Sequence, residues 1–240
     1  MKGPPCAVKE RHERFEGGAR GAPTDYYTRT PDAAMKNHPY ASIAPRLPEG
    51  TTVDPRTLVD SGGRPVELEI GPGRGGFIFE RLAEAPDACV IGLEIRLKWA
   101  TIVDRRLHDR GLAHRARVFA EDARSAIARF PDACVSIACL HFPDPWWKKR
   151  HAKRLVLAPA LLVELARTIQ PGGALFVQTD VEERAAEYER LLGETPAFTP
   201  WNDAGARVAE SPFTARSPRE RRAIQDGLPI YRLYYRRVST

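Results

Sequence analysis

From Pro65 onward, short apolar runs alternate with amphipathic stretches, and this alternation most strongly limits the folds open to the chain. Apolar runs of about four to eight residues between turn residues are typical of buried strands. In residues 75–85, Phe77, Ile78 and Leu82 fall on one face of a predicted helix. Strands that alternate with helices predict a parallel sheet that is covered by helices on both faces.

The predicted strands cover residues 66–71, 89–95, 117–121, 133–140 and 174–179. The predicted helices cover residues 75–85, 98–109, 124–129, 155–169 and 181–192. Pro171, Gly172 and Gly173 are expected to end a helix before the fifth strand begins. The segment around residues 231–235 is expected to add antiparallel strands at one edge. The predicted fold class is therefore α/β, a doubly wound, mostly parallel, Rossmann-like sheet with antiparallel C-terminal edge strands.

Residues 1–60 differ from the rest of the chain, because they are rich in proline, glycine and mixed charge and lack apolar periodicity. This segment is predicted to be extended or partly disordered. Tyr26, Tyr27 and Tyr40 leave open an alternative in which it lies against RNA or against the main domain. Residues 61–240 are expected to form a single domain, since that length can bury a sizeable core.

Charge and cysteine content narrow the class of protein. The formal net charge of +6 favours a polyanionic partner. No apolar stretch has membrane-spanning length and no signal segment opens the chain, so a cytoplasmic protein without a membrane partner is expected. Cys89, Cys134 and Cys139 lie in apolar runs without a C-x-x-C pair, which favours buried thiols and predicts no metal site.

A strand that ends in a glycine-rich turn covers residues 66–76, with the sequence V-E-L-E-I-G-P-G-R-G-G. Gly71, Gly73 and Gly76 satisfy the G-x-G-x-x-G pattern, so a dinucleotide site is one alternative. Glu69 argues against it, because its negative charge would lie close to a bound pyrophosphate. S-adenosylmethionine carries an ammonium and a sulfonium but no phosphate, so the E-x-G-x-G pattern suits that methyl donor better.

Acidic residues also follow the next two predicted strands. Glu94 is expected to accept both ribose hydroxyls of the cofactor, and Asp122 is expected to accept the adenine amino group. A single acidic residue at a strand end is often only a helix cap. Three of them at successive strand ends around a glycine loop favour a cofactor pocket.

The run at residues 133–140 leads into H-F-P-D-P-W-W-K-K-R-H-A-K-R at residues 141–154. Pro143 and Pro145 prevent continuation of helix or strand, so Asp144 is predicted in a stiff turn at a strand end. Tryptophans 146 and 147 follow, and then come the cations Lys148, Lys149, Arg150, Lys153 and Arg154. A carboxylate, flat aromatic surfaces and dense positive charge suit a site that binds a base and a phosphate backbone. The alternative is a solvated charge run.

The pattern F-P-D-P-W-x-K-K-R-H-x-K-R resembles the signature of the tRNA (guanine-N7-)-methyltransferase family, and the resemblance extends over about residues 65–237. It implies a class I S-adenosylmethionine-dependent methyltransferase domain at residues 61–240. The cofactor residues that it implies are Glu69, Gly71, Gly73, Glu94, Asp122 and Asp144. It also implies a catalytic role for Asp144 and substrate contacts for Lys148 and for Asp180 of the Thr179-Asp180 pair.

Near the C-terminus the chain departs from the family pattern T-x-[FY]-E. Ser217 stands in place of threonine, and Arg219 stands in place of the aromatic residue. The resemblance implies that Ser217 and Glu220 bind substrate, whereas the residues by themselves also fit the start of a helix. Trp147 replaces a common proline, and Pro72 lies inside the glycine loop.

The resemblance therefore predicts transfer of a methyl group from S-adenosyl-L-methionine to N7 of the variable-loop guanosine of tRNA, at position forty-six. Guanine N7 carries an in-plane lone pair, so the reaction needs alignment and exclusion of water rather than a strong base. Asp144 is expected to accept from the N1 and N2 protons of guanine, and Lys149, Arg150, Lys153 and Arg154 are expected to bind RNA phosphates. The alternatives are a methyltransferase that acts on another RNA or a small molecule, and a non-catalytic RNA-binding module.

Overall fold

The computed structural model describes residues 38–143 and 156–239. The chain divides into the units Met1–Pro39 and Tyr40–Thr240, and the second unit contains every helix and strand described below. Within the described residues, no helix combines the length and the apolar content that crossing a membrane requires.

The strands are β1 (Val66–Ile70), β2 (Val90–Leu93), β3 (Ala116–Phe119), β4 (Val135–His141), β5 (Ile169–Thr179), β6 (Phe198–Pro200), β7 (Arg207–Val208) and β8 (Tyr231–Arg237). The helices are the 3-10 helix η1 (Pro55–Thr57) and the α-helices α2 (Gly76–Glu84), α3 (Leu97–Asp109), α4 (Ala123–Ile127), α5 (Pro159–Thr168), α6 (Glu182–Gly193) and α7 (Pro218–Gln225).

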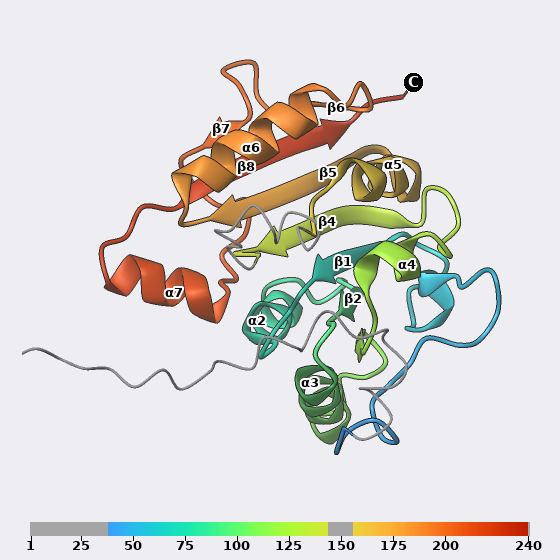
Figure 1. The fold of residues 1–240 in the computed structure, drawn as a ribbon. Coiled ribbons are helices and arrows are strands. Elements are labelled where there is room, and N and C mark those ends of the chain that lie inside the picture. Colours follow the sequence, from blue (N-terminus) through green and yellow to red (C-terminus); the bar gives the residue numbers. More distant parts are fainter. Residues whose placement is uncertain (1–37, 144–155, 240) are drawn as a thin grey trace, which may run out of the picture. The chain divides into compact units, whose positions relative to one another are not determined.

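The eight strands form one sheet in the order β3-β2-β1-β4-β5-β8-β6, and β7 pairs with β8 (Figure 1). Neighbours from β3 to β5 are parallel. The last strand, β8, is antiparallel to β5, β6 and β7. The prediction of a doubly wound, mostly parallel sheet with antiparallel C-terminal strands is therefore confirmed. The strand order reverses between β1 and β4, and such a switch point is where open α/β sheets place their ligands.

The two faces of the sheet bury different side chains. On one face, apolar residues of the strands form a single cluster with α4, α5 and α6, which contribute among others Ile127, Leu161 and Tyr188. On the other face, Phe77 of α2 packs with Phe176 and with the chain that precedes α7. Alternating strand residues supply the two faces, as the period of two in a β-strand requires.

Two boundaries differ from those predicted. The helix expected over residues 155–169 begins at Pro159, which occupies the first turn, where proline is tolerated because its missing N–H has no partner there. The fifth strand begins at Ile169, directly after α5, rather than at residue 174. Pro171, Gly172 and Gly173 lie within β5, where the pairing with β4 shifts register between Val135 and Ile137, so these residues form an irregularity in a strand.

Part of the predicted N-terminal segment contributes to the core. Leu47, Val53 and Val59 are buried in the cluster that includes α4 and α5. The backbone N–H of Val53 donates to the carbonyl of Arg129 at 2.8 Å. Residues from Tyr40 onward thus belong to the same compact unit as the sheet, whereas residues 1–37 lie outside the described residues.

An ion pair between the buried Asp104 and the partly buried Arg117 joins α3 to β3. Asp104 accepts from Arg117 Nε at 2.9 Å and from Arg117 Nη2 at 3.1 Å. The same carboxylate also accepts from the backbone N–H of Val118 at 2.9 Å. Only 8% of the Asp104 side chain is exposed, so its loss would leave a guanidinium and a strand N–H without this acceptor in a poorly hydrated place.

We predict that Asp104→Ala lowers the free energy of unfolding by about 3 kcal/mol, because it removes one partner of a buried, hydrogen-bonded pair. Urea unfolding followed by circular dichroism measures the change. Asp109→Ala is the matched control, since Asp109 lies on the same helix but is exposed and pairs with Arg105 only at 3.9 Å. The control is expected to change stability by less than about 0.5 kcal/mol. Equal effects of the two substitutions would contradict the role given to Asp104.

Candidate functional site

Four of the acidic residues singled out from the sequence lie at the carboxyl ends of parallel strands. Glu69 lies on β1, Glu94 directly follows β2, Asp122 follows β3 and Asp180 follows β5. Asp144 follows β4 in the sequence but lies outside the described residues, as do both tryptophans of the motif. The cations Lys148, Lys149, Arg150, Lys153 and Arg154 lie outside them as well.

The glycine loop connects β1 to α2 and leaves space beside its backbone. Gly71 and Gly73 have φ angles of 75° and 55°, which lie in the left-handed region that favours glycine. Among the described residues, no atom lies within 4 Å of the position that a Cβ of Gly71 would take. The Gly71 N–H donates to the carbonyl of Leu93 at 2.9 Å, which fixes the start of the loop beside β2. A ligand can therefore approach this backbone closely.

Glu94 is buried and already holds the glycine loop in place. Its Oε2 accepts from the N–H of Gly73 at 2.8 Å, and its Oε1 accepts from the N–H of Arg96 at 2.9 Å and from Arg96 Nε at 3.1 Å. A carboxylate offers about four acceptor sites, so these three bonds from described residues leave room for about one more. The Arg96 side chain is 51% exposed, and its movement would free a second site for a ribose diol.

Glu69 is the least satisfied of the acidic residues. Its side chain is buried, and within the described residues its Oε2 has no hydrogen-bond partner. Burial and, to a smaller extent, the nearby Glu94 carboxylate together raise the pKa of Glu69 to about 8. The group is therefore largely protonated at neutral pH, and a cationic ligand would supply the partner that it lacks.

The Asp122 carboxylate already has hydrogen-bond partners in this structure. Its side chain caps α4 by accepting from the N–H of Arg124 at 3.0 Å, and it also pairs with the Arg124 guanidinium. Burial works to raise the pKa of Asp122, but the hydrogen bonds from Arg124 outweigh it and hold that pKa below its ordinary value. The helix cap that the sequence left open is thus present, and adenine binding by Asp122 stays a prediction.

The C-terminal motif forms the start of α7. Ser217 is the N-cap and accepts from the N–H of Glu220 at 3.1 Å, with Pro218 in the first turn. Arg219, the residue that departs from the family pattern, pairs with Asp180 after β5. The Arg219–Asp180 ion pair connects the start of α7 with the end of β5, and Glu220 is fully buried.

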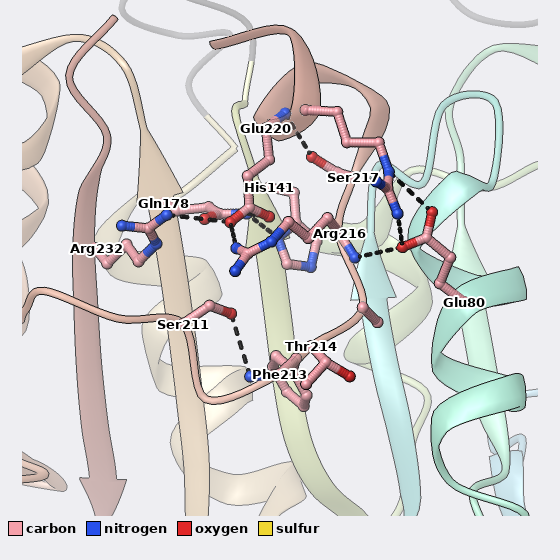
Figure 2. Close-up of polar contacts among 12 residues, drawn as sticks. Glu80, His141, Gln178, Ser211, Phe213, Thr214, Arg216, Ser217, Glu220 and Arg232 are labelled. Atoms are coloured by element: carbon pink, nitrogen blue, oxygen red, sulfur yellow. Dashed lines mark hydrogen bonds and ion pairs between the residues drawn. The ribbon is translucent and has the colours of Figure 1, made fainter. Parts of the chain in front are cut away.

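Sequence reasoning did not single out the residues that surround Glu220. The carboxylate accepts from Gln178 Nε2 at 3.0 Å, from Arg232 Nη2 at 3.1 Å and from Arg216 Nη1 (Figure 2). Burial works to raise the pKa of Glu220, but the bonds from Gln178, Arg232 and Arg216 hold it below its ordinary value. Gln178 also contacts His141, the residue before the F-P-D-P-W motif. Apart from the i,i+4 pair of Arg216 and Glu220, these side chains come from separate parts of the sequence, and no local spacing connects those parts.

Comparison with known proteins agrees with this arrangement. A family described as "Putative methyltransferase" matches residues 63–233. A tRNA (guanine-N(7)-)-methyltransferase of Synechococcus sp. (strain JA-3-3Ab) is 37% identical over 175 residues, which is 73% of each chain. The protein of the same name from Myxococcus xanthus (strain DK1622) is 38% identical over 170 residues, which is 70% of this chain and 81% of that protein.

Two solved structures share the fold at low sequence identity. Geranyl diphosphate C-methyltransferase from Streptomyces coelicolor A3(2), solved with S-adenosyl-L-homocysteine, has a TM-score of 0.50 and 15% identity and covers 77% of this chain and 78% of its own. The [4+2]-cyclase SpnF has a TM-score of 0.51 and 14% identity and covers 86% of this chain and 92% of its own. At this level the likeness concerns the fold, whereas the sequence relatives identify the group. The chain therefore belongs to the tRNA (guanine-N7-)-methyltransferase family.

Proposed function

We propose that this protein transfers the methyl group of S-adenosyl-L-methionine to N7 of the variable-loop guanosine of tRNA, at position forty-six. One observation carries the choice of methyl donor: the buried Glu69 carboxyl, with an oxygen that lacks a described partner, lies beside an open glycine loop. A cation beside this carboxyl favours its ionised form and pairs with it, whereas the charge of a phosphate would oppose that ionisation. The names of the relatives supply the base, the atom and the RNA.

The residues on the cofactor side each contact a different part of the methyl donor. Glu69 faces the ammonium and sulfonium charges, and Gly71 and Gly73 leave room for the methionine part. Glu94 accepts from the ribose hydroxyls, and Asp122 accepts from the adenine amino group. When bound, the donor supplies an electrophilic methyl carbon on its sulfonium, and the protein holds that carbon in line with the nucleophile.

The nucleophile needs little chemical help, because guanine N7 has an unprotonated lone pair at neutral pH. Asp144 accepts from guanine N1–H and from the N2 amino group, which distinguishes guanine from adenine. The methylated ring is cationic, so Asp144 and Asp180 stabilise charge that develops on the way to the transition state. Both carboxylates act as acceptors and counter-charges rather than as general bases.

On the substrate side, we assign Lys148, Asp180, Ser217 and Glu220, the last two through the helix that they start. The Arg219–Asp180 pair supports this, because it brings α7 to the end of β5. We assign the RNA backbone to the cations Lys149, Arg150, Lys153 and Arg154. The net charge of +6 favours this polyanionic partner, and an enzyme of mature tRNA is expected to act in the cytoplasm.

The experiment that tests the function incubates the protein with methyl-labelled S-adenosylmethionine and undermethylated tRNA, and then analyses the nucleosides. We expect label in N7-methylguanosine and none when the variable-loop guanosine is replaced by adenosine. Label in another nucleoside would favour a different RNA methyltransferase. Donor binding without any transfer to RNA would favour the non-catalytic alternative.

We predict that Glu69 makes stability depend on pH. A carboxyl whose folded pKa of about 8 exceeds its ordinary value of 4.5 contributes stability that is complete below pH 4.5 and is lost as pH rises through 8. Relative to the wild type, Glu69→Gln should therefore gain stability between pH 5 and pH 9 in urea unfolding. Calorimetric titration should also show that S-adenosylmethionine binds the variant more weakly. Unfolding free energies that stay parallel over this pH range would contradict the placement of Glu69.

We predict that Asp144→Asn retains most donor binding and loses about a hundredfold in kcat, since one guanine acceptor becomes a donor and the product cation loses its counter-charge. Single-turnover rates at saturating tRNA measure the effect. Asp132→Asn, at an exposed acidic residue that pairs with Arg167, is the matched control and should react at the wild-type rate. A normal single-turnover rate in Asp144→Asn would remove Asp144 from catalysis.

A further inference from the structure

Three buried side chains join the ends of β4 and β5 to α7, and we call His141, Gln178 and Glu220 the clasp. Gln178 Nε2 lies 2.8 Å from His141 Nδ1 and 3.0 Å from Glu220 Oε2 (Figure 2). The three residues are at most 9% exposed. A single amide nitrogen therefore lies between an imidazole and a carboxylate, away from water.

The hydrogen inventory of the clasp allows one arrangement. Glu220 is ion-paired with Arg216 and Arg232, so it is a carboxylate and only accepts. The amide of Gln178 has two hydrogens, and with one directed to each neighbour it requires that His141 Nδ1 accept as well. His141 is then neutral with its hydrogen on Nε2, and this atom, like Gln178 Oε1, is buried without a hydrogen-bond partner among the described residues. Burial lowers the pKa of His141 to about 4, in agreement with a neutral ring.

The backbone at the end of β4 is held by the same glutamine. Phe142 has a φ of 49°, a left-handed conformation that is unfavourable for a residue with a side chain. Its N–H donates to the carbonyl of Gln178 at 2.7 Å, and His141 is the register partner of Gln178 in the sheet. Gln178 thus contacts both residues at the end of β4: its side chain bonds to His141, and its backbone carbonyl accepts from Phe142. A strained residue persists where its surroundings determine it fully.

Aromatic side chains close the clasp off from water. The centroid of the His141 ring lies 4.2 Å from the centroid of the Phe77 ring and 5.9 Å from that of the Phe176 ring. Phe213 packs against both phenylalanines. In such surroundings a hydrogen-bond network is strong when complete and costly when one member is missing, so its members act as a unit.

The clasp also reaches the helix that follows the glycine loop. Glu80 of α2 accepts from the N–H of Arg216 at 2.9 Å and from Arg221 Nη2 at 2.6 Å. A Cβ on Gly76, the first residue of α2, would lie 2.6 Å from the ring of Pro218. The segment from Arg216 to Arg221, which contains Glu220, therefore packs directly against α2.

We propose that Gln178 is a positioning residue for methyl transfer, because through His141 and Phe142 it sets the direction in which the chain leaves β4 toward the sequence that carries Asp144. Glu220 acts on the substrate side of the site by holding Gln178, rather than by touching the base. This inference rests on the proposed function for its kinetic consequence, whereas the hydrogen-bond arrangement in the clasp is independent of it.

The test compares Gln178→Met with the wild type, since methionine keeps the length of the side chain and removes both donors. Misalignment of the reacting groups should lower the single-turnover rate at saturating tRNA by about tenfold to a hundredfold. The dissociation constants for S-adenosylmethionine and tRNA should change by less than about threefold. Gln170→Met is the matched control, because Gln170 lies on the same strand far from its carboxyl end, and it should react at the wild-type rate.

A second variant decides the matter if Gln178→Met does not fold. His141→Phe keeps an aromatic ring between Phe77 and Phe176 and removes the acceptor of Gln178, so it should fold and lose rate to a similar extent. The double variant should be no slower than the slower single variant, since the two residues act as one unit. Additive losses, a wild-type rate in either folded variant, or weaker tRNA binding with an unchanged rate at saturation would overturn the proposal.

A spectroscopic measurement tests the clasp without any assay. Nitrogen-15 spectra of the imidazole rings in the wild type should show His141 neutral with its hydrogen on Nε2 down to about pH 5. Hydrogen on Nδ1, or protonation above pH 6, would refute the arrangement. Absence of N7-methylguanosine with the wild type would refute the proposed function instead, so the two failures are distinguishable.

Discussion

The site depends above all on one constraint: three carboxyl groups are buried away from water near the carboxyl ends of the parallel strands. Glu69, Glu94 and Glu220 are each almost fully buried, and each meets the cost of desolvation differently. Glu94 uses backbone N–H groups, Glu220 uses two arginines and an amide, and Glu69 keeps a proton. Two of the three are therefore satisfied before any ligand arrives, and the third is free to respond to a positive one.

The hydrogen bonds of Glu94 and those of Glu220 also shape different sides of the site. The bonds to Glu94 shape the cofactor side, since they connect the glycine loop with the turn between β2 and α3. The bonds to Glu220 shape the substrate side, since they connect α7 with the end of β5. Close packing of Gly76 on Pro218 joins the two sides, so that a shift of one is transmitted to the other.

The sequence predicted the fold well where structure is local. Strand and helix periodicities located the five parallel strands, because burial repeats with the period of each element. The boundaries failed at Pro159, which starts a helix, and at the glycines of β5, which lie in an irregular strand. The strands β6 and β7 are too short to leave a periodic signal.

For the site, strand-end acids were visible because a carboxyl after a strand has a known position in such folds. The partners of those acids were not visible. Asp122 forms an ion pair with Arg124, and Asp180 forms one with Arg219. Which residues pair in this way depends on the folded backbone. His141 and Gln178 are far apart in the sequence and meet only because β4 and β5 are neighbours in register.

The place of β8 has a consequence for the order of events during synthesis. This strand is the last in chain order, yet it lies inside the sheet between β5 and β6. While the nascent chain emerges from the ribosome, β5 presents an open edge, and such an edge can pair with other chains. The sheet can close only after Arg237 has emerged.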